Sequence, residues 1–252
     1  MSVLERVAAV IGRDPEIKLV LVDFDDTLVD TAPRFQRARR ALFDLLVNLG
    51  FDEEVVRRTH HEEIDPIMRD RFGLGPQRLE HAFRATYEHL IGNAGLAFDE
   101  SIAVQCAWLG GTVAGTPPLL DGSLDALRRL AHTLPTVLYT QSGNVDYQLD
   151  CIRDCGVLEV VQHERVRITS SKTSEQFAAV LDEFAIEDPA TAWMIGNSMR
   201  SDINPALACG ANAILVEQEE PWEFDLVDPV HDGFQRAASF AEAVAFLLSM
   251  RR

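Results

Sequence analysis

The sequence predicts an α/β fold, in which a doubly wound parallel sheet carries an inserted helical domain. Three observations lead to this prediction. Short apolar runs end in polar, turn-forming residues; helical patterns alternate with the later runs; and one long stretch is helical in pattern but has no strand-like run. With 252 residues, of which 47% are hydrophobic and 25% charged, the chain can bury a core without disulfides or metals as staples.

The predicted strands are apolar runs too short for helices. They are Ile17–Val22, Thr136–Tyr139, Ala192–Ile195 and Ala213–Val216. The predicted helices of this part are Leu124–Ala131, Asp146–Cys155, Ser174–Phe184 and Asn204–Cys209. Strands and helices therefore alternate, which is typical of a parallel sheet because each helix connects two parallel strands across a face of the sheet.

The alternation breaks between residues 32 and 112. Helical patterns in this stretch are Phe35–Leu49, Glu53–Thr59 and Leu79–Ile91. Its exit is marked by residues that favour turns and extended backbone, namely Gly110, Gly111, Gly115, Pro117 and Pro118. We therefore predict a helical domain at 32–112, inserted between the two parts of a core at 1–31 and 113–252. A last helix, Phe240–Leu248, is expected to pack on that core.

Composition narrows the class of protein. The formal charge of −17 repels polyanions, so nucleic acid and anionic membrane surfaces are poor partners, whereas a small phosphorylated ligand needs only a local positive pocket. The four cysteines show neither zinc-type spacing nor the density of a disulfide scaffold. Met1–Ile11 lacks the apolar core of a signal peptide, and no run reaches membrane-spanning length, so we expect a cytoplasmic protein.

The strongest motif is LVLVDFDDTL, an apolar strand that leads directly into Asp23, Asp25 and Thr27. Ligands bind parallel sheets at the carboxyl ends of their strands. Two carboxylates this close repel each other, so a bound cation or a shared proton is expected to offset their charge. The alternative is a strand that merely ends in a polar turn.

Three further segments place polar groups at the ends of strands or the start of a helix. TVLYTQSG ends a strand at Thr140 and Gln141, where hydroxyls and amides can hold phosphate oxygens or simply cap a helix. Lys172 is one of only two lysines and precedes a helical pattern; it suits a phosphate or a carboxylate, or is an ordinary surface lysine. AWMIGNSMRSDINPA supplies Asn197 and Asp202, oxygen donors that suit Mg²⁺, although Asp202 could instead cap the next helix.

The four segments together resemble the four motifs of the haloacid dehalogenase (HAD) superfamily, and the resemblance spans residues 17–216. It implies a Rossmann-like core, and it makes the helical insertion similar to a first-type cap. The short segment between Thr140 and Lys172 leaves no room for the larger cap of other branches.

The resemblance also implies roles for the motif residues. Asp23 would be the nucleophile that forms an aspartyl-phosphate, Asp25 the general acid and then the base, and Lys172 the cation that neutralises nucleophile and phosphate. Thr27, Thr140 and Gln141 would contact the phosphoryl group. Mg²⁺ would be held by Asp23, the backbone carbonyl of Asp25, Asp202 and Asn197.

The predicted activity is that of a phosphatase acting on a small phosphorylated metabolite. Asn197 departs from the commoner aspartate of the fourth motif, which removes one negative charge from the metal site. Dehalogenation is disfavoured because that branch lacks the second acid of the first motif and needs no metal. A phosphonoacetaldehyde-type reaction is excluded because it needs a lysine of the cap to form a Schiff base, and the insertion contains no lysine. Phosphomutase and a non-catalytic phosphate-binding or regulatory protein remain alternatives.

The substrate itself is not predicted by these motifs. Five basic residues of the insertion could contact it, although exposure to solvent is the simpler expectation for each: Arg34, Arg37, His60, His61 and Arg69. Sugar phosphates, nucleoside monophosphates and phosphorylated acids all stay open, as does the oligomeric state.

Overall fold

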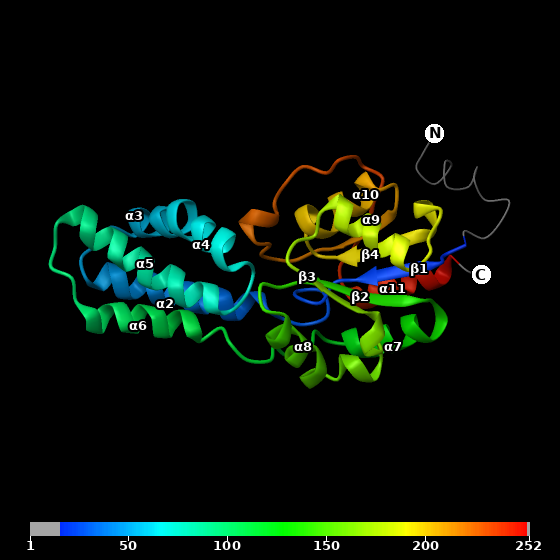
Figure 1. Cartoon of the computed structure of the whole chain (residues 1–252), viewed down its shortest axis with the longest axis horizontal. Helices are drawn as coiled ribbons and strands as arrows, with labels where there is room; N and C mark the ends of the chain where they lie inside the picture. Colours follow the sequence, from blue (N-terminus) through cyan, green and yellow to red (C-terminus); the bar gives the residue numbers. More distant parts are fainter. Residues whose placement is uncertain (1–15, 251–252) are drawn as a thin grey trace. The chain divides into compact units, whose positions relative to one another are not determined.

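A computed structural model describes residues 16–250 of the chain (Figure 1). Its contacts divide it into two compact units. The core unit comprises the described residues up to Asp30, Pro117–Thr140 and the chain from Ile152 onward; the helical unit comprises Thr31–Thr116 and Gln141–Cys151. The expectation about Met1–Ile11 lies outside the described residues.

The core unit is built on one six-stranded sheet. Its strands are β1 (Leu19–Val22), β2 (Thr136–Gln141), β3 (Val166–Thr169), β4 (Ala192–Gly196), β5 (Asn212–Val216) and β6 (Gln235–Ala237). The strand order is β3-β2-β1-β4-β5-β6, and β1 pairs in parallel with both β2 and β4. The chain moves outward from β1 in both directions, so β1 lies at the point where a doubly wound sheet binds its ligands.

Helices cover both faces of this sheet (Figure 1). The helices of the core unit are α7 (Ser123–Thr133), α9 (Ser174–Glu183), α10 (Asn204–Ala208) and α11 (Phe240–Ser249), and α8 (Val145–Asp154) runs through the unit boundary. On one face Leu21 and Tyr139 pack in a cluster with Phe177 of α9. On the other face Trp193 makes an edge contact with Phe246 of α11. Since side chains alternate along a strand, apolar residues on both faces explain why these strands read as continuous apolar runs.

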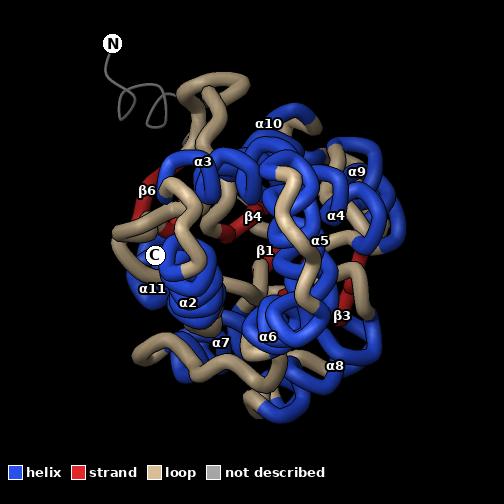
Figure 2. The backbone as a smooth tube through the Cα atoms, turned by 90° about the vertical axis from the view of Figure 1, so that its left-hand side faces the viewer, coloured by secondary structure: helices blue, strands red, loops and turns tan. Residues whose placement is uncertain are grey.

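The helical unit has its own apolar core. Its elements are α2 (Ala32–Asn48), α3 (Glu53–Arg58), a wide π-helical turn η1 (Thr59–Ile64), α4 (Asp65–Phe72), α5 (Gln77–Ala94) and α6 (Glu100–Gly111). Helices α5 and α6 pack against each other and lie side by side in both views (Figures 1 and 2). Leu42, Phe83 and Cys106 come from three different helices and belong to one buried cluster. The unit thus buries enough apolar surface to be a domain in its own right.

The predicted fold class is confirmed: a doubly wound parallel sheet with helices inserted after its first strand. The predicted boundaries of core and insertion stay a prediction, and contacts group Gln141–Cys151 with the inserted helices. Strands β3 and β6 and helices α4 and α6 were not expected from the sequence. None of the helices in the described part of the chain is long and apolar enough to cross a bilayer.

Candidate active site

Asp23 follows β1 directly and begins the site. Its backbone N–H donates to the carbonyl of Ile195 on β4 at 2.9 Å, so the residue is still aligned with the neighbouring strand. Its side chain is 7% exposed. Oδ1 accepts a hydrogen bond from Lys172 Nζ at 2.5 Å, and Oδ2 accepts one from Thr27 Oγ1 at 3.2 Å. Both carboxylate oxygens are therefore held by donors within the core unit.

The chain after Asp23 turns tightly and brings Thr27 back to it. Leu28 N donates to Phe24 O at 2.9 Å and Asp26 N donates to Val29 O at 2.8 Å. Asp26 has φ +55°, a left-handed conformation that is uncommon outside glycine and is tolerated better by aspartate than by bulky residues. This turn explains how the Thr27 hydroxyl reaches the Asp23 carboxylate four residues earlier.

Lys172 lies between two carboxylates. Its ammonium is 2.5 Å from Asp23 Oδ1 and 2.6 Å from Asp202 Oδ1, and all three side chains are buried. The lysine comes from the segment before α9, whose N-terminus is fixed by a capping box of Thr173 and Gln176. Burial of an ammonium is costly unless it is paired, so this lysine is a structural part of the site and not a surface residue.

Asp202 reaches the lysine from a wide turn. The segment after β4 forms a π-helical turn, η5 (Met199–Ile203), which continues into α10. Asp202 Oδ2 accepts from the backbone N–H of Ser198 at 3.0 Å. Gly196, at the end of β4, leaves the space that this carboxylate fills, because a Cβ at Gly196 would collide with the Asp202 side chain. A π turn of this kind is a frequent feature of functional sites.

The charges of this cluster shift its pKa values. Burial raises the pKa of Asp202 to about 7, the Asp23 charge adds to this effect, and Lys172 opposes it. Burial alone would lower the pKa of Lys172, but the charges of Asp202 and Asp23 raise it further than burial lowers it. The lysine therefore stays protonated, and two acids share one positive charge. A cation would remove that imbalance.

The Asn197 amide faces two oxygens. One end of the amide lies 3.3 Å from Asp23 Oδ2 and 3.1 Å from the backbone carbonyl oxygen of Asp25. If the amide nitrogen is at that end, Asn197 donates a hydrogen bond to both oxygens. If the amide oxygen is there, it accepts from Thr27 Oγ1 at 3.4 Å and lies beside the other two oxygens, so that three oxygens converge. Neighbouring ligands of an octahedral Mg²⁺ lie ~3 Å apart, so this donor set fits the ion.

The fit of Mg²⁺ to this site relies on an amide oxygen and a main-chain oxygen beside the Asp23 carboxylate. Within residues 16–250, no group of three His, Cys, Asp or Glu side chains converges on one point. Mg²⁺ is typically held by one or two carboxylates and keeps several waters. Asp23, Asn197 and the Asp25 carbonyl would hold the cation; Asp202, the fourth predicted ligand, contacts Lys172, and its place among the metal ligands stays a prediction.

The structure brings together Asp23, Thr27, Lys172, Asn197 and Asp202, as the sequence predicts. The side chain of Asp25 is half-buried next to this group, and Thr140 is buried at the carboxyl end of β2, beside β1. Gln141 ends β2 but is grouped with the helical unit, so its contact with the phosphoryl group stays a prediction.

Among the five basic residues of the insertion, His60 departs most from the expected exposure, since three others are half-buried and one is exposed. His60 is fully buried, not exposed to solvent. Its Nδ1 is 3.1 Å from Thr86 Oγ1, and its ring makes edge contacts with Phe43 and Phe83. Its Nε2 is buried without a hydrogen-bond partner among the described residues. His60 is therefore part of the core of the helical unit.

Three residues around the site were missed as participants. Gly196 provides room, Ser198 orients Asp202 through its N–H, and Asp225 accepts from Ser198 Oγ at 2.6 Å. The first two lie within the fourth motif, on either side of Asn197, and that position is the signal that could have identified them. Asp225 lies in an acidic stretch after β5 that has no motif, and nothing in the sequence singles it out.

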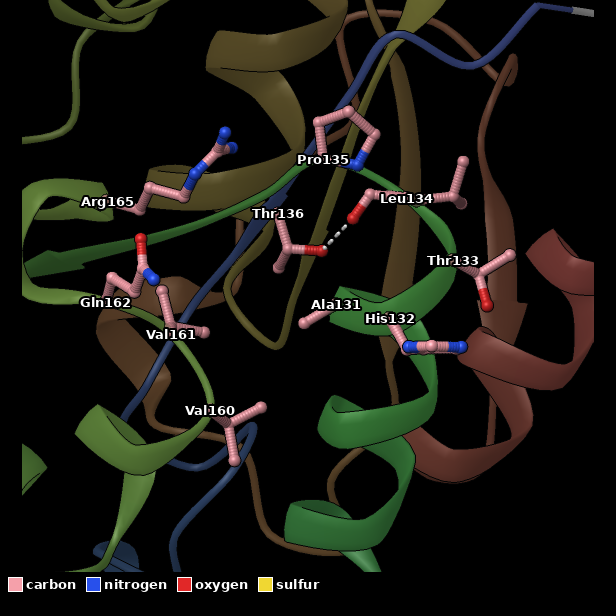
Figure 3. Close-up of a pocket in the computed structure, with 10 residues that line it drawn as sticks. All are labelled: Ala131, His132, Thr133, Leu134, Pro135, Thr136, Val160, Val161, Gln162 and Arg165. Carbon is pink, nitrogen blue, oxygen red and sulfur yellow. Dashed lines mark hydrogen bonds between the residues drawn. The ribbon is translucent and has the colours of Figure 1, made fainter.

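A pocket of about 430 Å³ lies elsewhere in the core unit (Figure 3). It is lined by the end of α7, the start of β2 and residues 160–165, including His132, Thr136 and Arg165. Thr136 begins β2 and Thr140 lies near the end of it, so this pocket opens at the amino end of the strand. It is therefore not part of the acidic site.

The fold and the site together define an α/β enzyme whose acids lie at the carboxyl end of the first strand. The chain belongs to the haloacid dehalogenase-like hydrolases, whose family profile matches residues 17–210. No curated protein matches the sequence significantly.

Solved structures share the fold. A haloacid dehalogenase-like family hydrolase from Xanthomonas campestris is 22% identical, with a TM-score of 0.74, covering 94% of this chain and 97% of that one. The HAD hydrolase YfnB from Bacillus subtilis, bound to magnesium, is 17% identical, with a TM-score of 0.59 and coverage of 92% and 99%. The 2-haloacid dehalogenase from Pseudomonas syringae is 21% identical, with a TM-score of 0.55 and coverage of 92% and 99%.

Proposed function

We propose that this hydrolase is a Mg²⁺-dependent phosphatase that cleaves small phosphate monoesters through an aspartyl-phosphate on Asp23. The observation that carries the proposal is the position of the Asp23 carboxylate. Lys172 holds its Oδ1, while Asn197 faces both its Oδ2 and the Asp25 carbonyl, where a cation fits. An anionic nucleophile can approach an anionic phosphate only if positive charge surrounds both, and this arrangement supplies it.

The first step is displacement at phosphorus. Asp23 Oδ1 attacks the phosphorus atom, the ester P–O bond breaks, and Asp25 gives its proton to the departing alkoxide. The products are an alcohol and a phosphoryl group bound to Asp23. Lys172 stays protonated throughout, because two acids raise its pKa, and so it keeps neutralising the oxygens of the transferring group.

The second step frees the enzyme. Asp25, now ionised, takes a proton from a water that attacks the phosphorus, and the bond between phosphorus and Asp23 breaks. Inorganic phosphate leaves, Asp23 is again a carboxylate, and Asp25 is again an acid. Thr140, buried at the end of β2, would position phosphate oxygens with its hydroxyl. Bound Mg²⁺ would supply charge neutralisation for the phosphate during both steps.

Haloacid dehalogenation is the competing function, since enzymes of that kind share this fold. The second acid favours phosphatase chemistry, because a halide leaving group needs no proton whereas an alkoxide does. The group of oxygens around Asn197 also favours phosphatase chemistry, because these oxygens suit a bound cation. Displacement of a halide by a carboxylate needs no such cation. A HAD phosphatase from Thermococcus onnurineus also shares the fold.

The substrate is proposed to be a small phosphorylated metabolite in the cytoplasm. The formal charge of −17 disfavours polyanionic substrates. The helical unit is proposed to be a first-type cap, as the resemblance of its place in the sequence implies.

The proposal is tested with purified protein and p-nitrophenyl phosphate, by measuring inorganic phosphate with Mg²⁺ and with excess chelator. We expect turnover that needs the metal and that falls by at least about 1,000-fold in Asp23→Asn, since an amide is not a nucleophile. A matched control is Asp228→Asn, an exposed acid of the same unit, which should keep full activity. Turnover that persists undiminished in Asp23→Asn would overturn the proposal.

A further inference from the structure

The turn that carries Asn197 and Asp202 is attached to a second segment, residues 222–230 after β5. Ser198 Oγ donates to Asp225 Oδ1 at 2.6 Å. Arg200 Nε donates to the Phe224 carbonyl at 2.7 Å, and its guanidinium lies 4.3 Å from the centre of the Phe224 ring. Asn204 Nδ2 donates to the carbonyl of Asp228 at 2.9 Å. The second segment therefore contacts the turn at its beginning, middle and end.

Among these contacts, only that of Asp225 brings a negative charge to the turn through its side chain. Arg200 and Asn204 contact backbone carbonyls or a ring of the second segment. Asp225 is half-buried on the short 3-10 turn η6 (Glu223–Asp225). Burial raises the pKa of Asp225; the Ser198 hydrogen bond opposes this, and the Asp23 charge reinforces it. Ser198 alone separates the Asp225 carboxyl from Asp202, because it donates to both of these acids.

Ser198 links Asp225 to the acid that contacts the lysine. Its hydroxyl donates to Asp225 and accepts from Ser201 N at 3.0 Å, so both capacities of the hydroxyl are used. Its backbone N–H donates to Asp202 Oδ2 at 3.0 Å. Asp225 therefore fixes the residue that orients Asp202 and that directly follows Asn197.

We propose that Asp225 compensates for Asn197: it holds the turn through Ser198 and supplies the negative charge that the Asn197 amide does not give to the cation. The inference rests on the proposed Mg²⁺ dependence. Asp225 is a positioning residue, because it acts through Ser198 and has no contact with the reacting atoms. Groups that orient the ligands of a metal commonly change its affinity by about 10- to 100-fold.

Mg²⁺ affinity tests this directly. Isothermal titration of the whole protein with MgCl₂ would compare four proteins: native, Asp225→Asn, Asn197→Asp, and the variant with both changes. Asparagine at 225 can still accept from Ser198, so this change removes charge while it preserves the hydrogen bond. We expect Asp225→Asn to raise the Kd for Mg²⁺ by about 10- to 100-fold, and Asn197→Asp to restore most of that loss in the double variant.

Asp228→Asn is the matched control, because it removes one acid from the same segment while its backbone carbonyl remains for Asn204. Its Kd should stay within about twofold of the native value, since its exposed charge is screened. Equal Kd values for the native protein and Asp225→Asn would overturn the inference and leave the proposed function intact. No Mg²⁺ binding and no metal-dependent phosphate release by the native protein would overturn both.

Circular dichroism and thermal unfolding without metal would show whether Asp225→Asn is folded. If Asp225→Asn were destabilised, the single variant Asn197→Asp would still test the proposal. Because Asp225 already supplies the charge, a carboxylate added at position 197 should lower the Kd for Mg²⁺ by about threefold or less. A gain of 10-fold or more in the native background would show that Asp225 does not supply the missing charge.

Discussion

At the scale of single residues, two separate functions are proposed for Asp25. Its backbone carbonyl oxygen lies 3.1 Å from the Asn197 amide, in the group that fits a cation. Its carboxyl is the proposed acid and base. The two functions belong to different atoms, so a substitution of the side chain separates them.

Asp25→Asn is expected to lower kcat by about 100- to 10,000-fold while the Kd for Mg²⁺ stays within about threefold. The loss should be larger for an alkyl phosphate than for p-nitrophenyl phosphate, because nitrophenolate leaves without a proton. Steady-state kinetics on both esters and a Mg²⁺ titration measure these effects. A similar loss on both esters with weakened metal binding would show that Asp25 serves mainly as a ligand.

Lys172 is the residue whose loss should cost most stability. It is the buried partner of both Asp23 and Asp202. Lys172→Met would leave two carboxylates buried without a cation, and removal of one partner from a buried pair typically costs about 3–5 kcal/mol. Urea unfolding in the absence of Mg²⁺ measures this loss.

Adding Asp202→Asn to Lys172→Met should recover part of the lost stability, because it removes one of the uncompensated charges. A double variant no more stable than the single one would mean that Lys172 contributes by packing, for example against Tyr139, whose ring it faces at 5.3 Å.

The sequence predicts this group of residues because each member ends a strand or begins a helix. Lys172 and Asp23 are separated by 149 positions, yet parallel strands bring their carboxyl ends to one edge of the sheet. Asp225 could not be predicted in this way. It reaches Ser198 only through the path of an irregular segment, and no periodicity or motif records such a path.

At the scale of elements, the turn after β4 depends on Gly196. A Cβ at this position would meet the carboxylate of Asp202, which would have to leave Lys172. We expect Gly196→Ala to lower the free energy of unfolding by about 1–3 kcal/mol and to weaken activity as well. Unfolding curves and phosphate release measure the two effects.

Gly92, within α5, is the matched control because a Cβ there would meet nothing within 4 Å beyond the neighbouring residues and backbone of its own helix. Gly92→Ala should stabilise the protein by about 0.5–1 kcal/mol, since alanine is the better helix former. A Gly196→Ala protein as stable and active as the native one would show that Asp202 does not need its observed position.

His60 in η1 should make the helical unit sensitive to acid. Its pKa lies well below the usual 6.5 because of burial first, and then the charges of Arg39, His61 and Arg78. The unfolded chain binds a proton near pH 6.5 and the folded chain does not. The stability that neutral His60 provides is therefore present above pH 6.5 and is lost as the pH falls, by about 1.4 kcal/mol per pH unit.

His60→Phe should remove this dependence, and Thr86 Oγ1 would still donate to the Ala82 carbonyl at 2.8 Å. Urea unfolding would measure the free energy of unfolding of both proteins at pH 7.5 and at pH 5.5. Between these two pH values, the native protein should lose about 1.4 kcal/mol more than His60→Phe. Parallel pH profiles for the two proteins would mean that His60 does become protonated in the folded state.

The elements that the sequence missed have physical reasons. Strand β3 is only half-buried, so its residues Val166–Thr169 do not form an apolar run. Strand β6 has three residues and includes Arg236. The π turns η1 and η5 arise from tertiary contacts, such as the approach of Asp202 to Lys172, and a periodicity of 3.6 residues cannot reveal them.

At the scale of the whole molecule, the negative net charge repels anions, whereas the site is proposed to bind one. The chain carries −17, yet its proposed substrate is an anion. The site resolves this locally, with Lys172 and the oxygens that fit a cation, so metal binding should also stabilise the folded chain. Saturating Mg²⁺ at about 100 times its Kd would add about 2.7 kcal/mol.

The claim that this hydrolase is a phosphatase and not a dehalogenase is tested most directly by offering both kinds of substrate to one preparation. Phosphate release from p-nitrophenyl phosphate and halide release from 2-chloropropionate would be measured in parallel, with Mg²⁺ and with chelator. The arrangement of Asp23, Asp25 and Lys172 predicts phosphate release that requires the metal, and no halide release in either condition. Halide release that persists with chelator, without phosphate release, would contradict it.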